Sequence, residues 1–327
     1  MINIKNKYRR TSILVKRNQT EAEYATKEEL ESKVDDVREE IQEVDNHLSN
    51  GYVTREKYHQ DTDNIYDKIN ELNSKIVQTK IDGSNFKFQG STFTDFPSEN
   101  FTFDNVTDFS YMFRDCGNLK SIELKSEQGH IMLSEARSMF EGCESLTNTS
   151  SNLFTHGNAS SMFKNCRKLE YFDTLGTHLD NTENMFYGCE NLKSVNGFWG
   201  GGDTTIALSK TCANMFYGCK SLTTIYVKFE QNGDGLNTTG MFYHCYNLTN
   251  FPGFKNLKSN LDISDCDKLT LESCINILND LYDFNGNNIT PKENEGKLRI
   301  PSNFLDKVGD NINIATNKGW TILDKYD

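Results

Sequence analysis

The apolar residues in the middle of the chain recur in one phrase, Met-Phe-x-x-Cys-x-x-Leu. Met, Cys and Leu fall at i, i+4 and i+7, so a short helix would carry them on one face. The six copies begin 27, 23, 23, 30 and 26 residues apart, at Met112, Met139, Met162, Met185, Met215 and Met241. Self-similarity at this period is typical of stacked-repeat proteins. We therefore predict a solenoid.

Each phrase is followed by a β-rich stretch, such as residues 171–175 and 223–229. The pattern therefore predicts an α/β repeat solenoid, with a short helix and a strand per repeat. Burying one Met, Phe or Leu contributes roughly 1.5–3 kcal/mol, whereas ordering one residue costs about 1–2 kcal/mol of backbone entropy. A single repeat therefore cannot fold alone. We expect neighbours to stabilise one another, with atypical repeats at both ends of the stack.

Sulfur is concentrated in the phrase, which uses six of the eight Met and six of the nine Cys. A free Cys often packs as a small apolar group, so we expect these thiols in the core. The odd total and the single Cys per phrase argue against a disulfide ladder. The chain has no Cys-x-x-Cys pair and its six His are scattered. We therefore predict no metal site, no cofactor and no catalytic residue.

The repeats occupy residues 105–270 and are flanked by two different caps. Residues 80–104 form an N-terminal cap or linker, and residues 271–327 form a C-terminal α/β cap. In the latter, a helix is predicted from residue 271, followed by a strand, a second helix that ends near Gly319, and a last strand from Trp320. The first of these helices places four residues on one face, namely Leu271, Ile275, Leu278 and Tyr282.

A heptad pattern precedes the repeats and predicts a coiled-coil stalk over residues 27–79, with a break near residues 50–51. Charged residues surround its apolar seam. The seam consists of Leu30, Val34, Val37, Ile41, Val44 and Leu48, and continues after the break with Ile65, Ile69, Leu72 and Ile76.

The stalk requires partner helices, because a narrow apolar stripe has little of its own chain to pack against. β-branched residues at both core positions favour more than two strands. A homotrimer is therefore the preferred prediction. A dimer and an intramolecular hairpin that folds back at Gly51 remain alternatives.

The first twenty residues carry six bases and no acid, on a chain whose net charge is −12. We interpret residues 1–26 as a peptide that anchors the chain in an acidic partner, such as a capsid or tail protein. A solvated tail is the alternative. No groove-reading motif accompanies the charges, so we do not expect a nucleic-acid partner. The bases are Lys5, Lys7, Arg9, Arg10, Lys16 and Arg17.

The phrase resembles the BspA-like leucine-rich repeat, and so does the longer stretch over residues 106–113, which leads into the first copy. This repeat is found in bacterial surface proteins and also in bacteriophage proteins. The resemblance covers residues 104 to 270. It implies a leucine-rich-repeat-like solenoid that recognises a partner at a cell or virion surface and has no catalytic activity.

No apolar run fits a secretory signal in the first twenty residues, and none elsewhere is long enough for a membrane span. Release by cell lysis within a phage particle would bring an unsecreted surface repeat outside the cell. We therefore predict a virion protein, a trimeric head or tail fibre that binds a host-surface glycan or protein. The alternative is a bacterial cell-surface adhesin or scaffold with the same repeats.

Two groups of aromatic residues are candidate contacts. Tyr187, Tyr217 and Tyr243 occupy the same slot in three successive phrases, so we expect them to form a row along one side of the solenoid. A tyrosine offers an apolar ring and a polar hydroxyl, which suit sugar or protein contacts. Phe198 and Trp199 precede three glycines in the longest spacer, which predicts a projecting loop.

Overall fold

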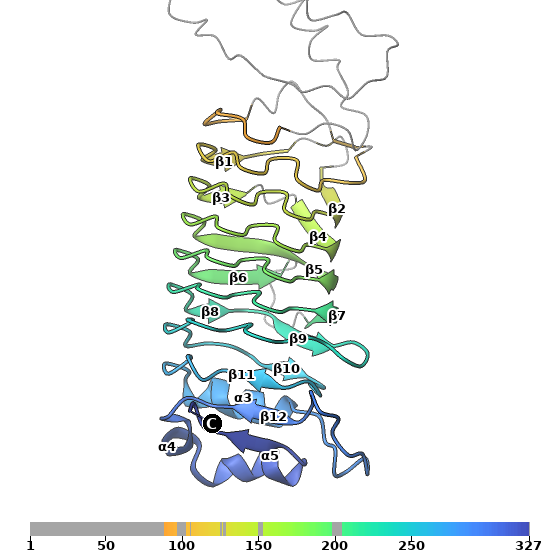
Figure 1. Cartoon of the computed structure of the whole chain (residues 1–327), viewed down its shortest axis with the longest axis vertical. Coiled ribbons are helices and arrows are strands. Elements are labelled where there is room, and N and C mark those ends of the chain that lie inside the picture. The colour runs from red at the N-terminus through yellow and green to blue at the C-terminus, as the bar shows by residue number, and fades with distance from the viewer. Residues whose placement is uncertain are drawn as a thin grey trace, which may run out of the picture. The chain divides into compact units, whose positions relative to one another are not determined.

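The computed structural model describes residues 88–96, 103–104, 106–124, 126, 129–149, 153–197 and 205–326. They lie in one compact unit of the chain. Layers of parallel strands stack on one another and end in a helical cap (Figure 1). The solenoid prediction is therefore confirmed. The predicted anchoring peptide and stalk lie outside the described residues, as do Phe198 and Trp199.

The main sheet runs in the order β10-β9-β7-β5-β4-β2, and β6 joins β5 to β8. Its neighbouring strands are parallel and come from successive repeats. The strands are β2 (Ile131–Glu135), β4 (Leu153–Asn158), β5 (Tyr171–Asn181), β6 (Ser194–Gly197), β7 (Thr205–Thr211), β8 (Thr224–Ile225), β9 (Lys228–Gln231) and β10 (Phe254–Lys255). A second parallel pair consists of β1 (Ser121–Ile122) and β3 (Asn148–Thr149).

Side chains alternate between the core and solvent along these strands, as the pleat of a strand requires. In β7, Ile206 and Leu208 are buried, whereas the residues beside them are half-exposed. In β2, Ile131 and Leu133 are buried and Met132 is exposed. One face of the sheet therefore covers the core, and the other faces solvent.

The Met-Phe-x-x-Cys-x-x-Leu phrase folds as a chain of turns, so the prediction of a short helix in each repeat was wrong. The backbone N–H groups alternate between two kinds of acceptor. The Met112 N–H donates to the Phe109 carbonyl three residues back, at 3.1 Å, whereas the Phe113 N–H donates to the Met139 carbonyl of the next layer, at 2.9 Å. In the phrase that begins at Met139, three of the eight backbone N–H groups thus donate to another layer, which does not happen inside an α-helix.

Two positions per phrase also exclude a helix, because they adopt the left-handed conformation. They are the residue before Met and the third residue after it, and φ lies between +53° and +77° at all twelve. Asn, Asp and Gly tolerate this conformation best, and they dominate these slots. The residues are Tyr111, Asp115, Ser138, Gly142, Ser161, Asn165, Asn184, Gly188, Asn214, Gly218, Gly240 and His244.

A column of stacked phenylalanine rings runs through the core. The second residue of every phrase stacks on its counterpart in the next layer, with ring centroids 5.4 to 5.8 Å apart and the planes within 10° of parallel. Phe88 adds one more ring before the first phrase, 5.3 Å from Phe113. The six phrase rings are fully buried.

The phrase cysteines form a second column, and each thiol donates to the carbonyl of the Phe one layer earlier. Cys189 Sγ, for example, lies 3.1 Å from the Phe163 carbonyl oxygen. All nine cysteines are free and buried. The prediction of core thiols is therefore confirmed.

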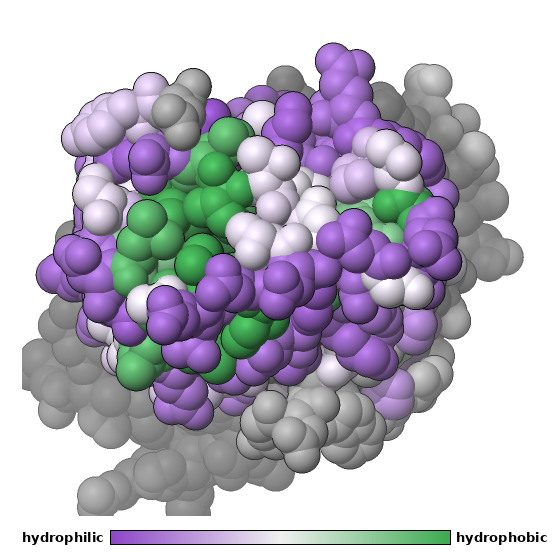
Figure 2. Space-filling model, turned by 90° about the horizontal axis from the view of Figure 1, so that it is seen from below, coloured by the Kyte–Doolittle hydropathy of each residue, from purple (hydrophilic) through white to green (hydrophobic). Residues whose placement is uncertain are grey.

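The C-terminal cap consists of α3 (Leu271–Asp280), α4 (Phe304–Val308), the 3-10 helix η3 (Gly309–Ile312) and α5 (Asn313–Asn317) beside a parallel sheet. The sheet comprises β11 (Leu261–Asp262), β12 (Lys297–Arg299) and β13 (Thr321–Leu323). Seen from the capped end, apolar side chains gather on part of this face (Figure 2).

The buried face of α3 differs from the predicted one. Cys274, Ile277 and Leu278 are buried, whereas Leu271 is 52% exposed. The helix begins at Leu271, where Thr270 caps it by accepting the Ser273 N–H, and its first residue turns toward solvent. The face is therefore rotated by about one residue relative to the prediction.

Candidate recognition surface

The third residue of each phrase forms one row along the turn side of the stack. Its first half is charged, because Glu141 lies between Arg114 and Lys164. The Glu141 carboxylate is 3.6 Å from Arg114 Nε and 3.4 Å from Lys164 Nζ. The second half is the predicted tyrosine row. The rings of Tyr187 and Tyr217 stack with centroids 4.6 Å apart and planes 7° from parallel.

This stacking limits what the tyrosines can bind. Tyr187 and Tyr217 each cover one face of the other ring, so those two faces are closed to a ligand. A planar or apolar ligand cannot lie between them. The third ring is different, since Tyr243 is tilted by 55° from Tyr217 at a centroid distance of 6.1 Å. The row therefore opens at Tyr243, which is 37% exposed.

Two further rings adjoin the opening. The His244 imidazole meets the Tyr217 ring edge to face, with centroids 5.1 Å apart. Its Nδ1 also contacts the Tyr246 hydroxyl group. Tyr246 is 43% exposed, so Tyr243 and Tyr246 together offer accessible aromatic surface.

The row opens because the layer after the sixth phrase is shortened. Cys266 follows Cys245 by 21 residues, fewer than separate any two phrases, and the Met-Phe start is replaced by Asp262 and Ile263. In earlier layers the N–H of the third residue after Met donates to a carbonyl of the next layer, as Gly218 does to Tyr243. The His244 N–H instead donates to the Asp265 carboxylate, at 2.8 Å.

Charged groups surround the opened end of the row. Asp265 lies 3.1 Å from Lys325 Nζ and 3.4 Å from His244 Nδ1. Asp262 lies 3.4 Å from Arg299 Nε. Partial burial, together with the nearby Asp262 carboxylate, raises the pKa of the Tyr243 hydroxyl. We call this group the Tyr243 cluster; it consists of Tyr243, His244, Tyr246, Asp262, Asp265 and Arg299.

A family model described as a BspA type leucine-rich repeat region matches the chain in six copies, over residues 56–150, 85–200 and 109–249. Together these ranges span residues 56–249, more than half of the chain. The chain belongs to this BspA-type family. No curated protein and no solved structure matches it. BspA-type repeats are typical of surface proteins, which points to recognition at a surface.

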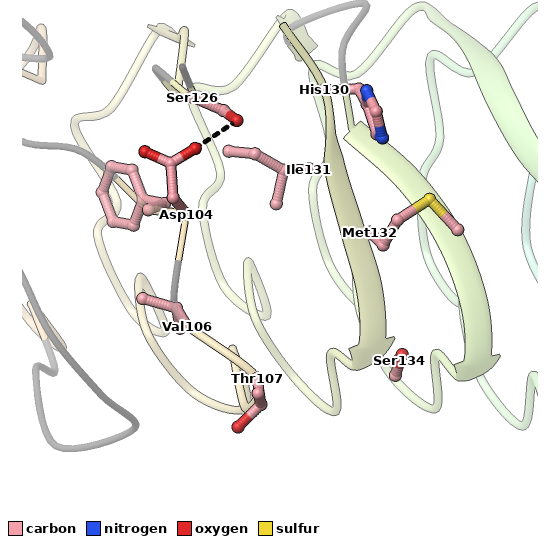
Figure 3. A pocket seen from close by; sticks show the side chains of 9 residues that line it. Asp104, Val106, Thr107, Ser126, His130, Ile131, Met132 and Ser134 are labelled. Atoms are coloured by element: carbon pink, nitrogen blue, oxygen red, sulfur yellow. Dashed lines mark hydrogen bonds between the residues drawn. The ribbon is translucent and has the colours of Figure 1, made fainter. Parts of the chain in front are cut away.

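A hollow lies at the other end of the BspA-type repeats, beside β2. It has a volume of about 270 Å³ and is lined by residues that include Asp104, Val106, Ser126 and His130 (Figure 3). The Ser126 hydroxyl donates to the Asp104 carboxylate at 2.7 Å. None of the predicted contact residues lines this hollow.

The described residues contain no group of three or more His, Cys, Asp or Glu side chains placed to share a metal ion. Within the same residues, no helix has the length and apolar character of a membrane span. The chemistry on offer at the Tyr243 cluster is therefore aromatic contact, hydrogen bonding and ion pairing.

Sequence reasoning found Tyr243 but missed His244, Tyr246 and the carboxylates. A signal was present, because the third residue after Met is Asp, Gly or Asn in the other five phrases and His only in the sixth. The position of Tyr246 is Gly, Glu, Arg or Lys in the others. Departure from the repeat pattern thus marks the cluster.

Proposed function

We propose that this protein is a non-enzymatic recognition protein whose Tyr243 cluster binds a host-surface glycan or protein. The opening of the tyrosine row at Tyr243 is the observation that carries the proposal. Exposed rings with partly buried carboxylates beside them are the combination that polar ligands with an apolar face require. Phe198 and Trp199 remain a second candidate contact.

We further propose that the protein is a trimeric fibre on a phage virion. Residues 1–26 anchor it in a capsid or tail protein, and residues 27–79 form the stalk. The heptad pattern and the basic arm support this arrangement. Three heads on one stalk bind a surface with higher apparent affinity than one, without any additional contact.

The Tyr243 cluster can be tested by removing its aromatic surface. Tyr243→Ala with Tyr246→Ala should reduce binding to host cells and to an array of surface glycans at least tenfold, while the fold persists because both side chains are partly exposed. Tyr171→Ala with Tyr226→Ala is the matched control, since these tyrosines are 47% and 51% exposed outside the cluster. Equal binding by the two double variants would refute the assignment.

If residues 1–26 anchor the chain, their deletion should prevent assembly into virions and leave the stability of the protein unchanged. A chain that lacks residues 1–26 should remain soluble and have the mass of a trimer, because the proposed stalk and the repeats are intact. It should fail to join virions when it is supplied in place of the full chain. Sedimentation velocity gives the mass, and blotting of purified particles gives incorporation. A monomer would refute the trimeric stalk, and normal incorporation would refute the anchor.

The BspA-type repeats also favour a second candidate, a bacterial cell-surface adhesin or scaffold. The two candidates differ in where the protein resides. Detection of the protein in purified particles supports the fibre, whereas detection on intact cells that carry no phage supports the adhesin. Binding through the Tyr243 cluster is common to both.

A further inference from the structure

We propose that His156 and His178 together bind one divalent transition-metal ion. They lie on the neighbouring parallel strands β4 and β5, and both side chains are exposed on the solvent side of the sheet. Their imidazole rings meet edge to face, with centroids 5.9 Å apart. The function proposed above does not use them.

The backbone of β4 and β5 is irregular beside the two histidines. The pairing of β4 with β5 is irregular on both sides of Gly157, which adopts a φ of +75°. A Cβ on Gly157 would lie 2.7 Å from the Ser134 carbonyl oxygen, and one on Gly176 would lie 1.9 Å from the Thr155 carbonyl oxygen. Side chains are therefore excluded where the strands approach most closely. Bulges of this kind redirect the neighbouring side chains.

The ring separation suits a shared ion. A ring nitrogen binds zinc at about 2.0–2.1 Å, which puts the ring centroid about 3 Å from the metal. Two rings can therefore share an ion when their centroids are within about 6 Å and a nitrogen of each ring points at the ion. The observed 5.9 Å meets the distance limit, and rotation of one exposed ring out of the edge-to-face contact would aim both nitrogens at one ion.

Ligand chemistry narrows the choice of ion. Imidazole suits Zn²⁺, Ni²⁺ and Cu²⁺, and the affinity rises from Ni²⁺ to Cu²⁺. Two protein ligands leave the remaining positions to water, so the ion stays open to a donor group from a bound partner. The nearby carboxylate of Asp180 already pairs with Lys210, 3.2 Å away. The pair therefore forms a two-histidine surface site.

Calorimetric titration of the full chain with Zn²⁺ alone tests the site. At pH 7.5 the wild-type chain should bind one equivalent of Zn²⁺. His156→Ala and His178→Ala should each weaken the affinity for this ion at least tenfold. The double variant should be no weaker than either single variant, because both residues serve one ion. His130→Ala, which removes the exposed histidine just before β2, should match the wild type.

The same titration at pH 5 adds a second readout. Imidazoles bind metal only when deprotonated, so the equivalent should be lost in acid and return at pH 7.5. Because the two histidines are exposed, circular dichroism should show that every variant is folded. Identical isotherms for the wild type and both single variants would overturn the proposal, as would an equal loss in His130→Ala.

Discussion

Raising the pH from 8 to 10 should unfold the repeat stack. Eight of the nine buried thiols have a raised pKa: Cys212 reaches about 12 and Cys274 about 11. Burial is the main cause in seven of them. In Cys143 the neighbouring Cys116 thiol is the first cause, and the same contact lowers the pKa of Cys116. The remaining five are Cys166, Cys189, Cys219, Cys245 and Cys266.

The direction follows from which state holds the protons. Thiols of the unfolded chain ionise near their ordinary pKa of 9.0, whereas the folded protein keeps them protonated. Their contribution to stability is therefore complete below pH 9 and is lost as the pH rises toward the folded values. Each thiol lowers the free energy of unfolding by about 1.4 kcal/mol per pH unit in that window. The seven thiols whose pKa is raised mainly by burial remove on the order of 10 kcal/mol by pH 10, comparable to the stability of a typical domain.

Urea unfolding followed by circular dichroism, at half-unit steps from pH 7 to 10.5, measures this loss. The free energy of unfolding should change little below pH 8.5 and fall steeply above 9. Returning the sample to pH 8 under reducing conditions should restore the fold. A free energy of unfolding that stays level up to pH 10 would show that the thiols are not buried together.

Phe186→Ala should lower the free energy of unfolding by about 3–5 kcal/mol, the usual cost of deleting a buried aromatic ring. The Phe186 ring stacks between Phe163 and Phe216 at 5.6 Å on each side, and Phe172 approaches it at 5.4 Å. Its removal leaves a cavity in the middle of the ring column. Because each layer packs only on its neighbours, the loss also weakens the coupling between the two halves of the stack.

Tyr187→Ala is the matched control, since Tyr187 is the next residue and also stacks on a ring of the following layer, but its side chain is only half-buried. It should cost clearly less than Phe186→Ala. Denaturant unfolding followed by fluorescence gives both free energies. Broadening or splitting of the Phe186→Ala transition, there or in scanning calorimetry, would indicate uncoupled halves. Equal, small losses in the two variants would contradict a stack held together by its buried rings.

The repeated features were predictable because each phrase supplies the same contacts. Spacing and sulfur content predicted the stack, the buried thiols and the tyrosine row. The helix prediction failed because the i, i+4 and i+7 spacing also fits three successive turns. Asn184 and Gly188, at the two left-handed positions, carried the evidence for turns.

The Tyr243 cluster was less predictable, because it depends on residues distant in sequence. Asp265 belongs to a layer that lacks the Met-Phe start, and Arg299 and Lys325 come from the cap. The sequence of a single phrase does not indicate which strand of the cap packs beside it. Only the exceptional His244 and Tyr246 marked the sixth phrase as different.

Alkylation of the native protein with iodoacetamide tests the central claim most directly, because all nine cysteines of the chain lie in the described stack and cap. At pH 8, mass spectrometry should find every thiol unmodified over hours, and all nine should react together once urea unfolds the chain. Rapid labelling of any of the six phrase cysteines in the folded protein would contradict the account, because that layer would then be open to solvent.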